Sequence, residues 1–416
     1  MLGAGWESWK LAHAYHRIGS GTTPTSGNAD YYDDAVGTPW ITTSELRETY
    51  IQRTTTQVTP SALEDFTSLR TYAPNSVFMA MYGATIGRLG ISTISATCNQ
   101  ACCVFEASDK FDNRFLFYWL WHRRAELISL SVGGGQPNLS QQDLKSERAL
   151  CPPLETQKRI VAFLDEKTAQ IDKLIARKQA LLERLAEKRQ ATITHAVTKG
   201  LNPAAAMKES GFDWLGQIPA HWGTIPLKWQ CSIQSGQVDP TEPPYDEMTL
   251  VAPDHIESGT GRLLAKKTAI EQAAISGKYL CHPENVLYSK IRPALRKVTL
   301  TDEVCLCSAD MYAVAPGNDF ERAYLFYILL TDAFTAYAEL ASMRVAMPKV
   351  NREALGSFPL IKPPIEEQQD IIRFIRAKLM QLDDVTVSVN DSVARLIEYR
   401  SALITSAVTG QIEWLR

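Results

Sequence analysis

Two long stretches of the chain carry apolar residues at helical spacing. In residues 152–199 the apolar positions recur every eleven residues, which keeps a stripe on one face of a nearly straight helix. Such positions include Ile160, Ile171, Leu182 and Ile193. Prolines open this stretch and no Gly or further Pro follows before Gly200, which is the usual punctuation of a helix. The pattern predicts a helix of about 40 residues, roughly 60 Å long.

The same sequence pattern is repeated further along the chain. Pro152-Pro153-Leu154-Glu155-Thr156-Gln157 returns as Pro363-Pro364-Ile365-Glu366-Glu367-Gln368, and the match continues without a gap at this constant shift. The regions before the two stretches match more loosely, with Trp9 aligned to Trp222. A single long repeat predicts two copies of one unit. The predicted segments are a globular domain (1–151), a helix (152–199), a linker (200–221), a second globular domain (222–361) and a second helix (362–412).

The apolar stripes predict how the two helices pack. A solitary helix with such a stripe would expose a large apolar surface, so each helix needs a partner. The first helix delivers the chain to the second domain, where the second helix begins, so side-by-side packing is antiparallel. The predicted helix-pair interface consists of Ile160, Phe163, Ile171, Leu174, Leu182, Leu185, Ile371, Phe374, Leu382, Val393 and Leu396. The alternative is that each helix folds onto its own domain.

The globular halves mix β-rich and helical patterns. Residues 75–81 and 285–289 resemble short buried strands, and residues 114–124 and 322–330 resemble aromatic helices. We therefore expect a mixed α/β fold with an internal two-fold repeat.

Charge gives a local signal only. The net charge of -3 is not that of a uniformly basic protein. After the second predicted strand, however, cations gather beside an aromatic residue, which suits phosphate contact and guanine readout. These residues are Tyr288, Lys290, Arg292, Arg296 and Lys297, and the matching place in the first half offers Tyr82, Thr85 and Arg88. Two equivalent sites with different side chains would read different DNA sequences. A solvated basic loop is the alternative.

Several classes of protein fit poorly. The apolar run at residues 324–330 is far shorter than the roughly 20 residues of a membrane span. Residues 1–10 lack the pattern of a signal peptide, so we expect a cytoplasmic protein without membrane contact. None of the eight cysteines forms a CxxC pair, which favours free, mostly buried thiols over a zinc site or a disulfide framework.

Catalytic motifs are incomplete. Glu242-Pro243-Pro244-Tyr245 resembles an amino-methyltransferase motif, but Glu replaces the short side chain that orients the target amine. Ser276-Gly277-Lys278-Tyr279 lacks the upstream Gly and the final Ser or Thr of a phosphate-binding loop. We expect no catalytic residue, no metal and no cofactor in this chain.

Taken together, the motifs resemble those of the DNA-specificity subunits of type I restriction-modification systems. The doubled proline-led helix carries the resemblance, together with residues 213–222, 39–46, 83–87 and 287–293. Thr42 and Thr43 of the second of these motifs join the predicted DNA-binding residues. Gly5-Trp6-Glu7-Ser8 departs from the pattern, because the second half has Ile218-Pro219-Ala220-His221 there.

The resemblance implies a division of labour. Each globular half would be a target-recognition domain for one half of a bipartite, asymmetric double-stranded DNA site. The helices would act as a spacer and as a platform for two modification subunits, which bind S-adenosylmethionine and methylate adenine. Restriction subunits would add ATP- and Mg²⁺-dependent translocation and cleavage.

Two other functions remain open. One is an interaction scaffold that grips proteins, which sequence-specific DNA retention would exclude. The other is a self-contained methyltransferase, which cofactor binding by the isolated chain would reveal.

Overall fold

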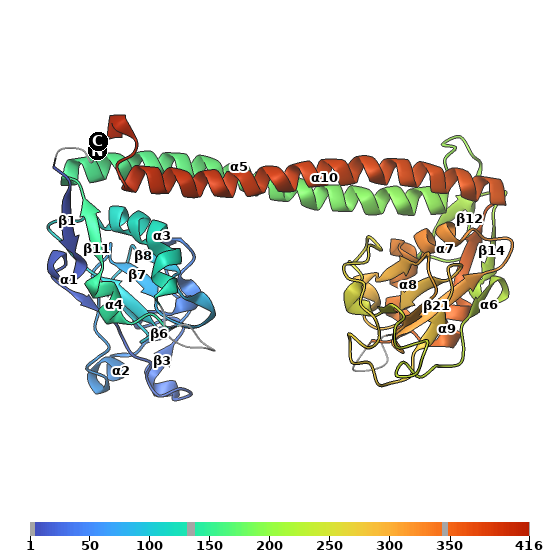
Figure 1. The fold of residues 1–416 in the computed structure, drawn as a ribbon, viewed down its shortest axis with the longest axis horizontal. Coiled ribbons are helices and arrows are strands. Elements are labelled where there is room, and N and C mark those ends of the chain that lie inside the picture. Colours follow the sequence, from blue (N-terminus) through green and yellow to red (C-terminus); the bar gives the residue numbers. More distant parts are fainter. Residues whose placement is uncertain (1–4, 131–137, 343–347, 416) are drawn as a thin grey trace. The chain divides into compact units, whose positions relative to one another are not determined.

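The computed structural model describes residues 5–130, 138–342 and 348–415, and the chain divides into two compact units. The first unit comprises Met1–Arg177 and Asp391–Arg416, and the second comprises Lys178–Asn390. Both units contain a globular part and a segment of each of two long helices, α5 (Leu154–Lys199) and α10 (Ile365–Val408) (Figure 1).

The first unit is built on a five-stranded sheet in the order β2-β10-β7-β8-β5. Its edge strand β5 runs parallel to β8, whereas the other pairs are antiparallel. The strands of the unit are β1 (Glu7–Lys10), β2 (Ile18–Gly19), β3 (Tyr32–Asp33), β4 (Thr38–Ile41), β5 (Thr49–Ile51), β6 (Gln57–Val58), β7 (Val77–Ala80), β8 (Leu89–Ser92), β9 (Thr97–Cys98), β10 (Cys102–Phe105) and β11 (Arg148–Cys151). Its short helices are α1 (Leu11–Ala14), α2 (Pro60–Asp65), α3 (Asn113–Ser129), α4 (Gln141–Ser146) and the 3₁₀ helices η1 (Ala29–Tyr31), η2 (Thr43–Glu45), η3 (Gly83–Thr85) and η6 (Glu413–Leu415).

The second unit contains a four-stranded sheet in the order β15-β21-β18-β19 and a three-stranded sheet in the order β16-β20-β17. Its strands are β12 (Met207–Glu209), β13 (Gln217–Pro219), β14 (Gly223–Pro226), β15 (Cys231–Ile233), β16 (Leu250–Val251), β17 (Tyr279–Cys281), β18 (Val286–Ser289), β19 (Val298–Leu300), β20 (Cys305–Cys307), β21 (Met311–Pro316) and β22 (Pro359–Lys362). Its helices are α6 (Leu227–Gln230), α7 (Arg322–Leu329), α8 (Asp332–Ser342), α9 (Arg352–Ser357) and the 3₁₀ helices η4 (Pro253–His255) and η5 (Pro293–Leu295).

The mixed α/β class and the internal repeat are confirmed. Strands β7 and β18 occupy the two predicted strand runs, and helices α3 and α7 occupy the two aromatic runs. In each copy the strand is buried throughout and is followed by a 3₁₀ turn and a second strand. The Asp112 side chain caps α3 by accepting hydrogen bonds from the backbone N–H groups of Arg114 and Phe115, which explains where that helix begins.

The proline-led motif attaches each long helix to its globular part through a buried glutamine. Gln157 accepts a hydrogen bond from the Asp112 N–H (2.8 Å) and donates to the Lys110 carbonyl (2.7 Å) and the Pro152 carbonyl (2.8 Å). Gln368 makes the matching bonds to the Glu321 N–H and to the carbonyls of Asp319 and Pro363. Both side chains are 0% exposed, so the motif attaches the long helix to the globular part in the same way in both units.

The far ends of the helices are held by tryptophans. Gly200, after α5, lies against Trp222, and a Cβ at this glycine would come within 3.1 Å of the ring. Gly410, after α10, lies against Trp6, and a Cβ there would come within 2.8 Å of the ring. Strand β1 pairs with β11 as β14 pairs with β22, which places Trp6 opposite Trp222 in the repeat. The alignment of Trp9 with Trp222 was therefore wrong, because it rested on a looser match than the strand pairing.

Within each unit the segments of α5 and α10 run antiparallel, as predicted. In the first unit Arg159 donates to the Trp414 carbonyl at 2.6 Å, and further along α5 the Asp172 carboxylate forms an ion pair with the Arg400 guanidinium at 2.9 Å. In the second unit Arg189 pairs with Asp383. The repeat matches Asp172 with Asp383 and Arg189 with Arg400. The two ion pairs are therefore equivalent, as in the self-complementary interface of a two-fold dimer.

The helix ends also belong to the globular cores. Residues from both helices join the core of the first unit, among them Ile160, Leu164, Ile404, Ala407 and Val408. The second unit takes in Ile193, Ala196, Val197, Ile371 and Ile375 in the same way. In each unit the helix segments therefore pack on the globular part as well as on each other. Pairing of the helices and folding of a helix onto its own domain, which the sequence analysis treated as alternatives, occur together.

The predicted helix-pair positions differ in how deeply they are buried. Ile160, Ile171 and Ile371 are at most 5% exposed. Six of the other predicted positions are half-buried: Phe163, Leu182, Leu185, Leu382, Val393 and Leu396. Leu174 and Phe374, however, are 45% and 38% exposed. Their exposure neither places these two side chains in the helix-pair interface nor removes them from it, so for them the assignment stays a prediction.

Candidate nucleic-acid interface

The basic segment of the second unit forms a tight turn after β18. Arg292 and Arg296 flank the 3₁₀ helix η5, and both adopt the left-handed backbone conformation, with φ of 48° and 47°. This conformation is uncommon for residues other than glycine and costs free energy. Backbone hydrogen bonds hold the turn, including one from the Arg292 N–H to the Pro348 carbonyl (3.1 Å).

The structure separates the five residues that the sequence grouped here. Arg292 is exposed, and no ion pair is seen for it among the described residues. Arg296 pairs with Asp332 at 2.7 Å, and the Lys297 ammonium donates to the Pro253 carbonyl at 2.6 Å. The cationic patch is therefore smaller than the sequence implied, because two of its members have partners within the unit.

Tyr288 and Lys290 are buried rather than displayed. Tyr288 is 1% exposed and packs edge-on against Phe334, with ring centroids 5.2 Å apart, because β18 is covered on both faces. Lys290 is 8% exposed, and its ammonium donates to the Ala309 carbonyl above the Tyr312 ring. Burial, and then the nearby Lys349 charge, lower the pKa of Lys290. In this structure neither side chain lies where it could contact DNA, which corrects the sequence-based assignment.

The equivalent turn of the first unit follows β7. Tyr82 and Thr85 are half-buried around η3, and Arg88 is exposed immediately before β8. Gly87 has a φ of 78°, and a Cβ there would come within 2.9 Å of the Ile128 side chain. Glycine thus lets the turn lie close against α3 and leaves Arg88 at the surface.

Thr42 and Thr43 lie at η2, before the edge strand β5. Both are half-buried. The Thr42 N–H donates to the Glu45 carboxylate at 2.9 Å, and its hydroxyl lies 2.7 Å from the Ser44 hydroxyl. Thr42 therefore takes part in capping the turn, beside a surface that the sequence analysis missed.

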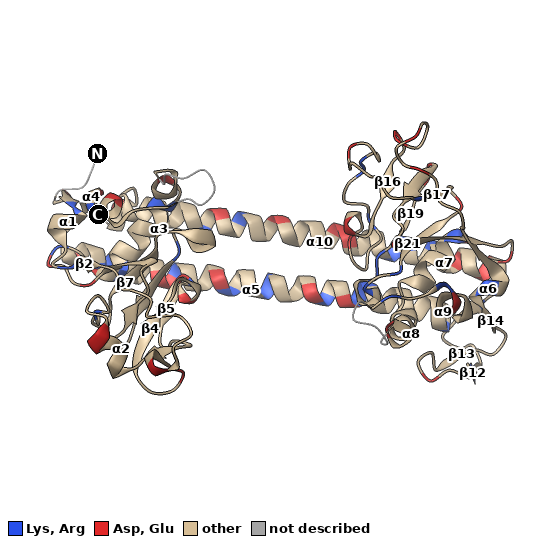
Figure 2. Cartoon of the chain, turned by 90° about the horizontal axis from the view of Figure 1, so that it is seen from below, with Lys and Arg blue, Asp and Glu red and all other residues tan. Residues whose placement is uncertain are grey.

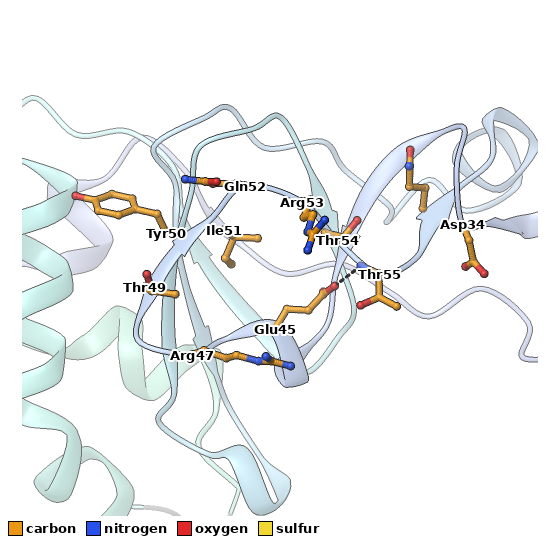
Figure 3. A pocket seen from close by; sticks show the side chains of 11 residues that line it. Asp34, Glu45, Arg47, Thr49, Tyr50, Ile51, Gln52, Arg53, Thr54 and Thr55 are labelled. Atoms are coloured by element: carbon orange, nitrogen blue, oxygen red, sulfur yellow. Dashed lines mark hydrogen bonds between the residues drawn. The ribbon is translucent and has the colours of Figure 1, made fainter. Parts of the chain in front are cut away.

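That surface is a polar cavity of 740 Å³, which we call the β5 cavity (Figure 3). Its lining residues are Asp34, Glu45, Arg47, Thr49, Tyr50, Ile51, Gln52, Arg53, Thr54, Thr55 and Gln57. The signal that could have revealed it is the polar run at residues 47–57, which directly follows the motif that contains Thr42.

Acidic and basic residues are mixed over the rest of the surface. Figure 2 shows both charges along α5 and α10 rather than a single basic stripe. This agrees with the small net charge and restricts any DNA contact to local sites such as the two turns and the β5 cavity.

The two incomplete catalytic motifs make hydrogen bonds within their own loops. Glu242 opens an exposed turn in which its carbonyl accepts from the Tyr245 N–H at 2.8 Å. Lys278 is 7% exposed, and its ammonium donates to the Ser276 hydroxyl at 2.7 Å. Burial lowers the pKa of Lys278. The Lys278 ammonium is thus engaged within its own loop.

Other predictions concern cysteines and the membrane. All eight cysteines are free, and each is buried except Cys231, which is half-buried. No group of side chains suited to a metal ion occurs within the described ranges. Among the helices of those ranges, none has both the length and the apolar character of a membrane span. Residues 1–4 of the segment judged for a signal peptide lie outside the described residues.

Known proteins resemble this chain over most of its length. The family described as Type I restriction modification DNA specificity domain matches residues 6–184 and 244–387. The chain is 29% identical over 311 residues to the specificity subunit of the type I restriction enzyme EcoDI from Escherichia coli, covering 71% of this chain and 69% of that protein. It is 20% identical over 353 residues to the MjaVIII specificity subunit from Methanocaldococcus jannaschii, covering 81% and 79%.

Solved structures share the fold. A chain from work on complex assembly and conformational transition of the type I R-M system superposes with a TM-score of 0.72 at 17% identity, covering 98% of each chain. The HsdS subunit from Thermoanaerobacter tengcongensis gives a TM-score of 0.53 at 16% identity, covering 99% of this chain and 98% of that one.

Proposed function

The chain belongs to the DNA specificity subunits of type I restriction-modification systems, and from this membership we propose that its two globular parts read the two halves of a bipartite, asymmetric DNA site. The observation that carries the proposal is a difference between equivalent turns. A glycine-containing turn presents Arg88 in the first unit, and a proline-led turn presents Arg292 in the second. The residue before the 3₁₀ helix is Tyr82 in the first turn and Arg292 in the second, and a different side chain at this equivalent position supports the reading of different bases.

Partners supply the chemistry in this proposal. Two modification subunits would dock on the helices and provide S-adenosylmethionine and adenine methylation, and restriction subunits would provide ATP- and Mg²⁺-dependent translocation and cleavage. The chain itself would hold no cofactor and act in the cytoplasm, where the DNA lies. Exposed apolar side chains on α10, such as Met380 (65%) and Val387 (60%), support a docking role for that helix.

A direct experiment tests DNA recognition. The chain is purified with its modification subunits, its DNA retention is measured, and the adenines modified in a host carrying the complex are mapped by sequencing. We expect one bipartite motif with a constant gap. An interaction scaffold would give protein capture without a DNA motif, and that result would refute the proposal. S-adenosylmethionine binding by the isolated chain would instead favour a self-contained methyltransferase.

The helices would set the length of that gap. Half-sites read from one side of B-DNA have centres roughly 34 Å or 10 base pairs apart. Inserting four residues near Gln179 turns the stripe by about 400° and nearly preserves its facing, whereas two residues turn it by about 200°. We expect the four-residue insertion to lengthen the gap and leave both half-sites unchanged. An active complex that kept the original gap would exclude the spacer role.

A further inference from the structure

The β5 cavity is bounded by a loop that one carboxylate closes. Glu45 accepts a hydrogen bond from the Thr42 N–H at 2.9 Å and another from the Thr55 N–H at 2.7 Å. Figure 3 shows the second bond joining the two ends of the loop that carries Arg47, Gln52 and Arg53. A loop fixed at both ends is already ordered before a ligand arrives, which reduces the entropy cost of binding.

The side chains of this loop suit the edges of bases. Arg47, Gln52 and Arg53 are exposed. Within the described ranges no ion pair is seen for either arginine, although the Arg47 Nε donates to the Ser44 carbonyl at 3.3 Å. Arginine binds the guanine O6 and N7 atoms with two hydrogen bonds, and glutamine binds the adenine N6 and N7 atoms similarly. The neighbouring threonine hydroxyls suit phosphate oxygens.

The sheet also brings the Arg88 turn close to strand β5. Strand β5 pairs in parallel with β8, with Thr49 opposite Gly90, and the Glu48 N–H donates to the Leu89 carbonyl at 2.9 Å. Arg88 directly precedes β8, and all three residues of β5 line the cavity. The strand that lines the cavity is therefore paired with the strand that follows the Arg88 turn.

The second unit has different chemistry at the matching place. Its 3₁₀ helix η4 corresponds to η2, with His255 in the position of Glu45. There Glu257 pairs with Arg262 at 2.8 Å and accepts from the Thr260 hydroxyl at 2.7 Å. The acid and the cation of this loop satisfy each other, whereas Arg47 and Arg53 of the first unit remain available to a ligand.

We propose that the β5 cavity is a base-reading site of the first unit, in which Arg47, Gln52 and Arg53 contact base edges in the major groove of double-stranded DNA. Glu45 is a positioning residue, because its two carboxylate oxygens accept hydrogen bonds from the backbone N–H groups that fix the loop. This inference rests on the proposed DNA recognition and deepens it by naming the residues that select one half-site.

The test uses the complete complex with its modification subunits and DNA carrying the mapped motif. Arg47→Ala, Gln52→Ala and Arg53→Ala are each expected to weaken binding by about 10- to 100-fold and to remove discrimination at a position of one half-site. Discrimination in the other half-site should be unchanged. Arg70→Ala is the matched control, because Arg70 is exposed in the same unit but does not line the cavity.

A Glu45→Gln variant tests positioning separately. The amide oxygen replaces one acceptor, but the amide nitrogen cannot accept the other N–H. We expect weaker binding to the cognate site with unchanged affinity for unrelated DNA and unchanged discrimination in the second half-site. General unfolding would alter all three quantities.

The outcomes separate the two proposals. If the wild-type complex has no DNA motif, the proposed function fails. If the wild-type complex reads its motif and the three cavity variants keep full affinity and discrimination, only the base-reading site is refuted. Loss of discrimination in both half-sites or equally in the Arg70→Ala protein would also refute it.

Discussion

The two units mount their globular parts with the same contacts but present different side chains at their surfaces. Gln157 and Gln368 make matching hydrogen bonds, and the Asp172–Arg400 pair is the counterpart of the Arg189–Asp383 pair. At the surface, the Arg47 and Arg53 cations of one unit contrast with the closed Glu257–Arg262 pair of the other. The comparison teaches that the attachment of a reading surface and its chemistry are carried by separate residues, so that one can change without the other.

The largest expected effect distinguishes the two tryptophan contacts. Trp222 is 1% exposed and donates to the Glu367 carboxylate at 2.9 Å, whereas Trp6 is only half-buried. We expect Trp222→Ala to lower the free energy of unfolding by about 3–5 kcal/mol and Trp6→Ala by about 2 kcal/mol, measured in urea. Trp229→Ala is the control, because this side chain is 71% exposed. Equal losses at Trp6 and Trp222 would contradict the stated difference.

Matching losses are expected at the buried glutamines. Leucine at position 157 or 368 leaves one N–H and two carbonyl groups without their partner, which should cost about 3 kcal/mol in either unit. Urea unfolding of Gln157→Leu and Gln368→Leu measures the two values. Gln170→Leu serves as control, since Gln170 is exposed on the same helix as Gln157. A loss confined to one variant would show that the mountings are not equivalent.

The turn arginines should affect different half-sites. Arg88→Ala and Arg292→Ala should each weaken binding by about 1–3 kcal/mol if the side chain contacts a base. A phosphate contact would instead reduce the salt dependence by about one unit and leave specificity unchanged. DNA titrations at several salt concentrations with single-base variants of the mapped motif distinguish these cases. Unchanged affinity and methylation in both proteins would remove the turns from the interface.

The smallest effects concern the ion pairs between the helices. The aspartates are more than half exposed, so each pair should contribute about 1 kcal/mol or less. Arg400 also lies 4.8 Å from the Trp121 ring centroid, and Arg400→Ala should therefore cost about 0.5 kcal/mol more than Arg189→Ala. Double-mutant cycles with Asp172→Ala and Asp383→Ala isolate the pairs, and dissimilar coupling energies would argue against their equivalence.

The framework was predictable from the sequence because it depends on patterns. The eleven-residue period identified both long helices, and the constant shift identified the repeat. The surface was less predictable, because neighbours in sequence point in different directions. Lys290 and Arg292 are two residues apart. Lys290 is nevertheless buried, with its ammonium bonded to a backbone carbonyl, whereas Arg292 is exposed. Arg47 and Arg53 line the same cavity in a loop that the Glu45 carboxylate closes. No local sequence pattern predicts this contact.

The sharing of helix ends between units has a consequence for synthesis on the ribosome. The core of the first unit includes Ile404, Ala407 and Val408, which are translated about 200 residues after α5 is complete. At about 5–20 residues per second this delay lasts roughly 10–40 s. The α5 residues in the core of the second unit are Ile193, Ala196 and Val197. They are translated before the globular part of that unit, so its folding is not delayed by them. The nascent first unit therefore spends that interval with the apolar surface that these three residues cover still exposed to water.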